Sequence, residues 1–394
     1  MRKYENARSE ERQLIKDMHL KDIPALAELK EQLIKSAANN RNGHALLFHG
    51  SSAGLIFPLV KAYCQFLACK KPLENDSCGE CKNCLQFEQN SYPDLHYSFP
   101  FANKDKAPKR LDADYFMREW LEFIKEKTFF ALNDWLDHAG LKGKSALINV
   151  YEVRRINEKL NYKSYSGGKK FVIIYLPEYL NLPASNKFLK TLEEPSDNSM
   201  IFLVSEKTES LLQTITSRCQ KVHVPPLHLK DIEDFLNAQG VDNETAKISA
   251  SLAKGSILEA LQISKNNQSY IAYALLFQNW MRSCYSAKTK EIFTFVDEFA
   301  KLGRDQQREA LHFFMETFEL SLKAKIKQEE ARHPLFSQIG FKLNGFASVL
   351  HFKNSKEAYD VLSEANNDIR RNGNVKLIMS DVSFKFSNLL KMKA

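Results

Sequence analysis

Four cysteines lie close together in the sequence and could bind a metal ion. They are Cys69, Cys78, Cys81 and Cys84, in the stretch CKKPLENDSCGECKNC. Four soft thiolate ligands at such short spacing are typical of a closed tetrahedral zinc site. No histidine or carboxylate completes a pattern with an open coordination position, so we expect a structural Zn²⁺ that folds this knuckle. Unpaired thiols, a disulfide or an iron–sulphur cluster are the alternatives, although dense exposed thiols without a metal would oxidise readily.

The stretch HALLFHGSSAGLIF begins as a phosphate-binding loop does, with an apolar strand followed by Gly50 and small residues that include Gly54. A working Gly-x4-Gly-Lys-Ser/Thr loop needs a lysine for the phosphates and a hydroxyl for magnesium. Here Ile56 takes the lysine position and Phe57 the hydroxyl position, and Tyr175 takes the place of a metal-binding acid after the later strand. We therefore do not expect this chain to bind ATP productively. The alternative is a strand and helix that never bound a nucleotide.

The elements that would position these residues alternate between strands and helices. Apolar runs and apolar residues at helical spacing predict strands at 44–48, 170–176 and 200–205, and helices at 23–40, at about 55–69 and before Pro195. Short apolar strands that alternate with amphipathic helices indicate a parallel sheet covered on both faces. The expected fold class is therefore α/β.

Changes in composition predict three domains. Residues 1–227 form the α/β domain, 228–265 a small helical lid, and 266–394 an all-helical domain. The charged and aromatic-rich block 101–144 is too long for an ordinary connection, so we interpret it as a helical insertion. Its aromatic side chains are expected to pack on the host domain, and a dedicated partner surface is the alternative.

The bulk composition is that of a soluble globular protein. Among the 394 residues, 44% are apolar and 26% are charged, and no run approaches the roughly 18 apolar residues that cross a bilayer. The charged start lacks the apolar stretch of a signal peptide, so we expect a cytoplasmic protein with no membrane partner. The net charge of +8 fits nucleic acid or another acidic partner without requiring either.

Several blocks, taken in order and spacing, resemble one family: the delta-prime subunits of the bacterial DNA polymerase III clamp loader, which are non-hydrolysing members of the AAA+ class. The resemblance covers about 20–265 and leaves 101–144 outside the usual pattern. The blocks that carry it are NRNGHALLFHG, the cysteine knuckle, SYPDLH, ASNKFLKTLEEPS, IFLVSEKTESLLQTITSRCQ and PPL. The resemblance implies an AAA+ domain with a helical lid, and a C-terminal collar domain that joins a ring.

The resemblance also gives the segment TITSRCQ a function. It implies that Ser217, Arg218 and Cys219 are a Ser-Arg-Cys motif whose arginine points toward ATP bound by a neighbouring subunit. A planar, permanently charged guanidinium suits the stabilisation of a transferring phosphoryl group. By composition alone, Arg218 would be a solvated residue at a helix end.

The partners implied by the resemblance are the tau/gamma and delta subunits, with the sliding clamp and primer-template DNA as shared substrates. The chain would then be a non-catalytic subunit of a DNA-directed DNA polymerase holoenzyme that helps to load the clamp onto primed DNA. One alternative is an autonomous AAA+ ATPase of clamp-loader or helicase type. Another is a nucleic-acid-binding zinc protein, which is weaker because the charges around the cysteines are mixed in sign.

Overall fold

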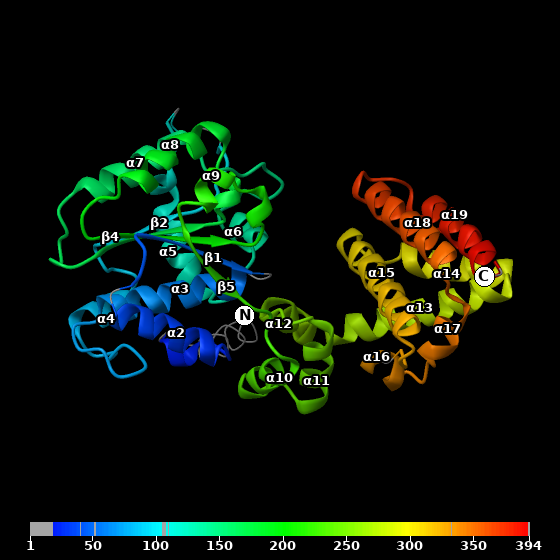
Figure 1. Cartoon of the computed structure of the whole chain (residues 1–394). Coiled ribbons are helices and arrows are strands. Elements are labelled where there is room, and N and C mark those ends of the chain that lie inside the picture. The colour runs from blue at the N-terminus through cyan, green and yellow to red at the C-terminus, as the bar shows by residue number, and fades with distance from the viewer. Residues whose placement is uncertain are drawn as a thin grey trace, which may run out of the picture. The chain divides into compact units, whose positions relative to one another are not determined.

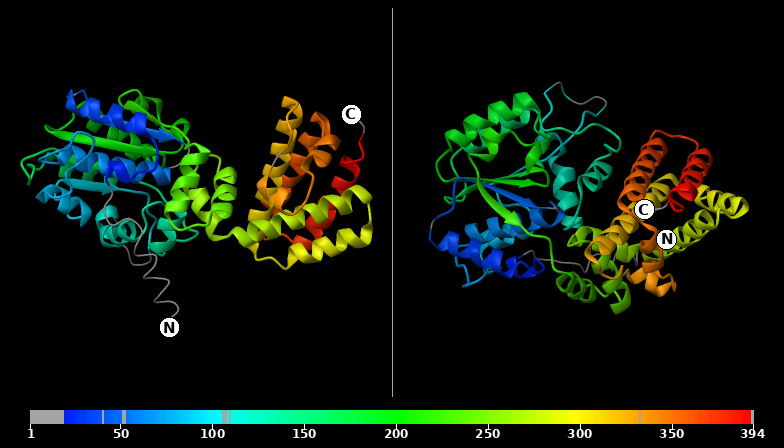
Figure 2. Two further views of the ribbon diagram at one scale, coloured as in Figure 1. Left: turned by 90° about the horizontal axis from the view of Figure 1, so that it is seen from below. Right: turned by 45° about the vertical axis from the view of Figure 1, so that its right-hand side comes forward.

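The computed structural model describes residues 19–39, 41–50, 53–104, 108, 110–331 and 333–392. The chain divides into two compact units, Met1–Gln262 and Ile263–Ala394. The division falls inside helix α12 (Ile257–Lys265), the last of the lid helices. Each unit is described by itself below (Figures 1 and 2).

A parallel sheet forms the centre of the first unit. Its five strands, in the part of the chain that the structure describes, lie in the order β2-β3-β4-β1-β5. The strands are β1 (Ala45–Gly50), β2 (Leu95–Ser98), β3 (Lys170–Tyr175), β4 (Ser199–Ser205) and β5 (Gln220–Val224). The three central strands confirm the apolar runs that predicted them, each to within two residues at its ends. The sequence analysis missed the two edge strands, β2 and β5.

Helices cover both faces of the sheet, as Figure 1 shows. On one face α3 packs against β1, β3 and β4, with α2 and α4 beside it. On the other face α7, α8 and α9 enclose an apolar core that includes Leu47, Ile156 and Phe188. The helices are α2 (Ala27–Ala38), α3 (Ala53–Ala68), α4 (Lys82–Glu88), α7 (Val150–Asn161), α8 (Leu182–Glu193) and α9 (Gln213–Thr216), with short 3₁₀ turns η1 (Leu20–Asp22), η3 (Pro177–Tyr179) and η4 (Thr208–Ser210).

The block at 101–144 contains η2 (Ala113–Phe116), α5 (Met117–Glu126) and α6 (Leu132–His138). Trp120 and Trp135 are fully buried, which confirms that the aromatic side chains of this block pack on the host domain. The indole nitrogen of Trp135 donates a hydrogen bond of 2.8 Å to the carbonyl of Pro100. The block is therefore part of the first unit's core.

A buried ion pair on α7 attaches this block to the sheet. The Glu152 carboxylate accepts hydrogen bonds from Arg155 at 2.6 and 2.9 Å and from the backbone N–H of Ala113 at 2.8 Å. Arg155 also donates to the carboxylate of Asp114 at 2.8 Å and to the backbone carbonyl of Tyr97 in β2. One guanidinium therefore contacts the inserted block and the edge strand at the same time.

The lid follows β5 as three helices, α10 (Leu229–Ala238), α11 (Asn243–Leu252) and α12. The backbone turns sharply at Gly255, where φ is +90° and an added Cβ would lie 2.5 Å from Pro226. In addition, the Leu227 N–H bonds to the Gly255 carbonyl at 2.9 Å, so the lid is tied to the linker that precedes it.

The second unit is helical throughout its described residues. Trp280 lies in its core, where the ring contacts Phe295, Phe314 and Phe386 and the indole nitrogen donates to Ser383. The helices are α13 (Asn267–Ser286), α14 (Thr289–Ala300), α15 (Arg304–Lys327), α16 (Pro334–Gln338), α17 (Leu343–Val349), α18 (Phe352–Arg370) and α19 (Val375–Leu389). Within the described ranges, no helix is both long and apolar enough to span a bilayer.

Glu152→Ala tests the attachment of the inserted block. It leaves the Arg155 charge and the Ala113 N–H buried without their main acceptor, and we expect the free energy of unfolding to fall by about 3–5 kcal/mol. Urea denaturation followed by circular dichroism measures the loss. Glu122→Ala is the matched control, because Glu122 pairs with Arg118 on the solvent side of α5 and its removal should cost no more than about 1 kcal/mol. Equal effects of the two variants would contradict the role given to the buried pair.

Candidate functional site

The turn between β1 and α3 is the place where a phosphate-binding loop would lie. Ser51 and Ser52 of this turn lie outside the described residues, and α3 begins at Ala53. An added Cβ at Gly50 would lie 2.3 Å from the Val224 carbonyl oxygen, and one at Gly54 would lie 2.9 Å from the Phe130 carbonyl oxygen. Close approach of protein backbone therefore accounts for both glycines.

The first turn of α3 points into a cluster of aromatic rings. Ile56 and Phe57 are only 1% and 2% exposed. The Phe57 ring centroid lies 5.2 Å from that of Phe130, 5.6 Å from Trp120 and 5.7 Å from Tyr175. The positions expected for a magnesium-binding hydroxyl and for a metal-binding acid are thus two aromatic rings, Phe57 and Tyr175, in contact with each other.

The connection between α5 and α6 extends this cluster to the lid. The Phe129 ring contacts Phe235 of α10 at 5.6 Å between centroids, while Phe130 packs on Phe57. Leu258 of α12 also approaches within 3.4 Å of the Cβ position of Gly54. The inserted block therefore lies between the start of α3 and the lid, where it fills the space above the turn with side chains.

Arg218 lies on the surface just after α9, at the entry to β5. Its guanidinium is 2.6 Å from the Glu193 carboxylate at the end of α8, and it donates to the Thr214 carbonyl at 3.0 Å. The side chain remains 37% exposed, so the guanidinium is oriented but still accessible. The Ser217 hydroxyl donates to the same Thr214 carbonyl at 3.2 Å. Two acceptors from two helices therefore fix the direction of the arginine.

Cys219 follows Arg218 and is buried. Burial raises the pKa of its thiol to about 11, so it remains protonated at neutral pH. The residue is among the apolar core on the α7–α9 face of the sheet. It is a packing residue.

The four cysteines of the knuckle converge on one point. Cys69 follows the end of α3, Cys81 is the N-cap of α4 and Cys84 lies inside α4. Sulphur–sulphur distances are 3.5 Å for Cys69–Cys78 and for Cys81–Cys84, 4.0 Å for Cys69–Cys81 and 3.9 Å for Cys78–Cys84. A tetrahedral ion with metal–sulphur bonds of about 2.3 Å gives edges of about 3.8 Å. The four thiols can therefore hold one metal ion.

The cluster also favours thiolate at one ligand. Burial by itself would raise the pKa of Cys81, but hydrogen bonds from the backbone of Lys70 and from Cys84 lower it to about 6. Metal ligation requires the deprotonated thiol. The two helices that flank the knuckle are also connected, since the Asn83 side chain in α4 donates a hydrogen bond of 2.7 Å to the carbonyl of Ala68, the last residue of α3.

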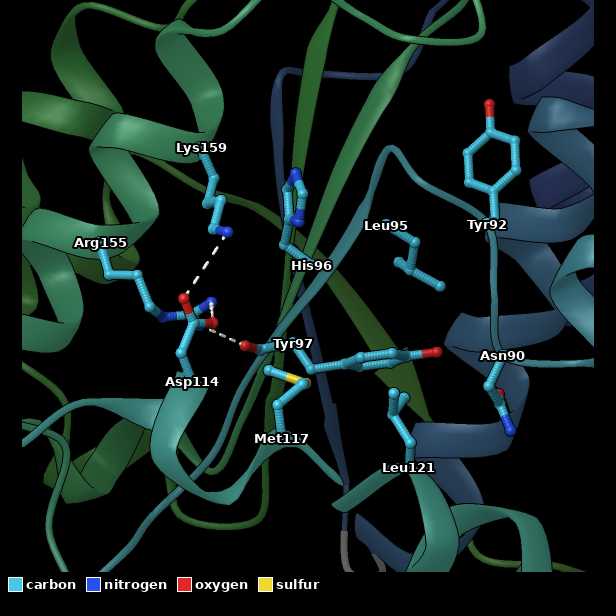
Figure 3. Close-up of a pocket in the computed structure, with 10 residues that line it drawn as sticks. All are labelled: Asn90, Tyr92, Leu95, His96, Tyr97, Asp114, Met117, Leu121, Arg155 and Lys159. Atoms are coloured by element: carbon cyan, nitrogen blue, oxygen red, sulfur yellow. Dashed lines mark hydrogen bonds and ion pairs between the residues drawn. The ribbon is translucent and has the colours of Figure 1, made fainter. Parts of the chain in front are cut away.

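A separate cavity of about 150 Å³ lies along the edge strand β2, and Figure 3 shows its lining. Arg155 and Lys159 contribute positive charge from α7, but both contact Asp114, at 2.8 and 3.6 Å. Burial and these two cations lower the pKa of His96 to about 4, so it is neutral at pH 7. Arg155 also pairs with the buried Glu152 at 2.6 Å, so two carboxylates balance the two cations and leave no net charge to attract an ion.

These features define the class of the protein: an α/β domain with a parallel five-stranded sheet, followed by a helical lid and a helical C-terminal unit. Comparison with known proteins gives the particular family. Residues 25–228, more than half of the chain, match the family described as "DNA polymerase III, delta subunit", and the chain belongs to that family.

Named relatives agree with this assignment. The DNA polymerase III subunit delta′ of Bacillus subtilis (strain 168) is 27% identical over 237 residues, which are 60% of this chain and 58% of that protein. The subunit of the same name from Escherichia coli (strain K12) is 26% identical over 292 residues, 72% of this chain and 71% of that one. Among solved structures, a DNA polymerase III gamma subunit-related protein of Thermotoga maritima overlaps 92% of this chain and 99% of its own, at 15% identity and a TM-score of 0.39.

Phe57→Ala tests whether the hydroxyl position is a core position. Truncation leaves a cavity among the surrounding rings, and we expect the free energy of unfolding to fall by about 3–5 kcal/mol. Leu182→Ala on α8 is the control, because Leu182 is exposed and its truncation should change stability by less than about 0.5 kcal/mol. Thermal and urea denaturation measure both. A Phe57→Ala protein as stable as the control would show that the rings do not fill this site.

Proposed function

We propose that this chain is a non-catalytic subunit of the bacterial DNA polymerase III clamp loader, and that it supplies Arg218 to ATP bound by a neighbouring subunit. The observation that carries the proposal is that the chain has an accessible arginine but no open phosphate site beside α3. An oriented guanidinium lies accessible on the surface, while aromatic side chains pack on the first turn of α3, where a phosphate-binding loop would have its lysine and hydroxyl. The chain has the arginine for phosphoryl transfer but lacks the lysine and the hydroxyl.

The chemistry of the arginine supports a role in trans. A guanidinium stabilises the negative charge that develops on a transferring γ-phosphoryl group, and the planar fork can bind two oxygens at once. Glu193 and Thr214 occupy two of its donors and keep the group pointing in one direction. A group held in this way loses little conformational freedom when it meets a nucleotide.

The partners follow from the family. The neighbours would be the tau/gamma subunits, which bind and hydrolyse ATP, and the delta subunit, with the sliding clamp and primer-template DNA as the shared substrates. The helical unit from residue 263 would be the collar that joins the ring. Because the start of α3 is packed among aromatic rings, this subunit would keep one geometry while its neighbours cycle ATP.

An autonomous ATPase is the alternative, and the ring cluster argues against it. ATP binding in the usual way needs a lysine at position 56 and a hydroxyl at position 57 that reach the nucleotide. In this chain both positions are almost fully buried in the core. Binding of labelled ATP to the purified chain, lost on substitution of Ile56, would favour the alternative.

The knuckle is proposed to hold a structural Zn²⁺ through Cys69, Cys78, Cys81 and Cys84. Four thiolates leave no open coordination position, so the ion would have no catalytic role. When bound, it would fix the segment between α3 and α4, which has few apolar side chains of its own.

Arg218→Ala tests the proposed role in trans. In a complex reconstituted with tau/gamma, delta, clamp and primed DNA, the ATPase site that it serves should lose about 10³-fold or more in turnover, because that is the usual contribution of an arginine finger. The total rate of DNA-stimulated ATP hydrolysis should fall by the fraction that this one site contributes. Gel filtration should show that the complex still assembles. Glu193→Gln is the matched control: it breaks the same ion pair but keeps the guanidinium. Unchanged turnover with Arg218→Ala, or an equal loss with Glu193→Gln, would contradict the assignment.

Metal analysis tests the zinc proposal. Freshly purified protein kept in reductant should contain about one zinc ion per chain, measured by inductively coupled plasma mass spectrometry. Cys81→Ser or Cys84→Ser should lower that zinc content. A strong chelator should destabilise the wild-type chain, because metal binding contributes to folding. Cys219→Ser should keep its zinc, since Cys219 lies outside the cluster. Iron in place of zinc, or no metal, would contradict the proposal.

A further inference from the structure

The loop that joins α7 to β3 presents two tyrosine rings to solvent. Tyr162 is 66% exposed and Tyr165 is 81% exposed. Neither ring contacts another aromatic ring in the part of the chain that the structure describes. Their neighbours in the loop are serines, glycines and lysines rather than apolar side chains. Exposure of this extent on an ordered loop is uncommon for a residue that otherwise packs through its ring.

A buried carboxylate holds the loop in this conformation. Asp94, which immediately precedes β2, is only 4% exposed. It accepts hydrogen bonds from the backbone N–H groups of Tyr165 and Ser166, both at 2.8 Å, and from the hydroxyls of Ser164 and Ser166 at 2.9 and 2.5 Å. Burial alone would raise the pKa of Asp94, but these hydrogen bonds lower it, so the carboxylate is charged at neutral pH.

The other end of the loop is fixed as well. The buried Lys170 side chain donates to the carbonyls of Leu160 and Tyr162, the latter at 3.0 Å. The Tyr92 hydroxyl bonds to Ser166 at 2.9 Å. The loop therefore keeps its shape without help from either exposed ring, and both rings are free to contact something else.

Two lysines belong to the same loop as the rings, and two exposed acidic groups lie outside it. Lys163 is exposed between the two tyrosines, and Lys169 is half-buried after the glycines. Neither lysine forms an ion pair among the described residues. Exposed acidic groups nearby in the chain are Glu158 on α7 and Asp197 before β4. Rings spaced along a loop with unpaired lysines are the arrangement that stacks on bases and contacts phosphates.

We infer that the 162–169 loop is a contact site for single-stranded nucleic acid, with Tyr162 and Tyr165 stacking on unpaired bases and Lys163 and Lys169 contacting phosphates. A protein partner is less well matched, because an aromatic anchor in a protein interface is normally surrounded by further apolar side chains that exclude water. The inference does not rest on the role proposed for Arg218, because it concerns a different loop and requires no ATP.

Anisotropy of fluorescein-labelled oligothymidylate with the purified full-length chain tests the inference. The double variant Tyr162→Ala/Tyr165→Ala should bind about 5- to 150-fold more weakly for each ring that stacks. Tyr162→Phe/Tyr165→Phe should bind within about twofold of wild type, because the rings remain. Tyr285→Ala is the matched control, since Tyr285 on α13 of the other unit is also an exposed tyrosine, at 58%. Because all three side chains are exposed, unfolding temperatures should not change.

Two further measurements separate the contribution of the lysines to phosphate binding from that of the tyrosine rings to base stacking. Lys163→Gln/Lys169→Gln should lower the slope of log affinity against log salt by about 1.4, since each phosphate contact contributes about 0.7 on a single strand. With a blunt duplex of the same length, the tyrosine-to-alanine change should have no effect, because paired bases cannot stack on the rings.

Two results would overturn the inference. The first is a wild-type chain that does not bind the single strand, and the second is an alanine double variant that binds it within twofold of wild type. In the second case, loss of co-elution with the sliding clamp would make the loop a protein contact. None of these results bears on ATP turnover with Arg218→Ala, so the two proposals fail separately.

Discussion

The packing of Phe57 against rings from the inserted block is the constraint on which the rest of the first unit depends. In a nucleotide-binding relative of this fold, the space above the β1–α3 turn is kept open for phosphates and is lined by polar groups. Here the rings of Phe130, Trp120 and Tyr175 pack on Phe57 at the start of α3, and Phe129 continues the contact to the lid. Burial of this much aromatic surface holds core, insertion and lid together by the hydrophobic effect, without the energy of a bound ligand.

The strands connect this closed site to Arg218. β5 begins two residues after the arginine and pairs with β1 along its whole length, up to Gly50 beside Val224. The guanidinium end of the Arg218 side chain is held by Glu193, the last residue of α8. The position of the guanidinium is therefore set by the sheet and by one helix end, both of which belong to the same rigid core. In the proposed role, that rigidity lets the subunit offer its arginine at a constant place.

Much of the fold could be predicted because the signals are local. The strands β1, β3 and β4 are continuous apolar runs, as strands buried on both faces must be, and the four cysteines lie within one short stretch. The edge strands were missed because neither is a continuous apolar run: β5 (QKVHV) exposes most of its polar side chains, and β2 (LHYS) has only four residues, two of them polar, although it is largely buried.

The pairings made by the fold were beyond the reach of the sequence. Nothing in the order of residues places Glu193 beside Arg218, or Phe130 above Gly54, because each pair comes from segments far apart in the chain. Glu152 gives no signal either, since an Arg three residues later on a helix usually indicates a solvated pair rather than a buried one. The residues missed are those whose environment is set by tertiary packing.

The contact at Gly54 has a consequence for the history of such a chain. Restoring a lysine and a hydroxyl to the first turn of α3 would not reopen the site, because the carbonyl of Phe130 and the rings around it would still stand in the way. The intervening block would have to be displaced at the same moment, together with the ion pair that anchors it. Single substitutions in the first turn of α3 would therefore leave this site filled by the rings packed on it.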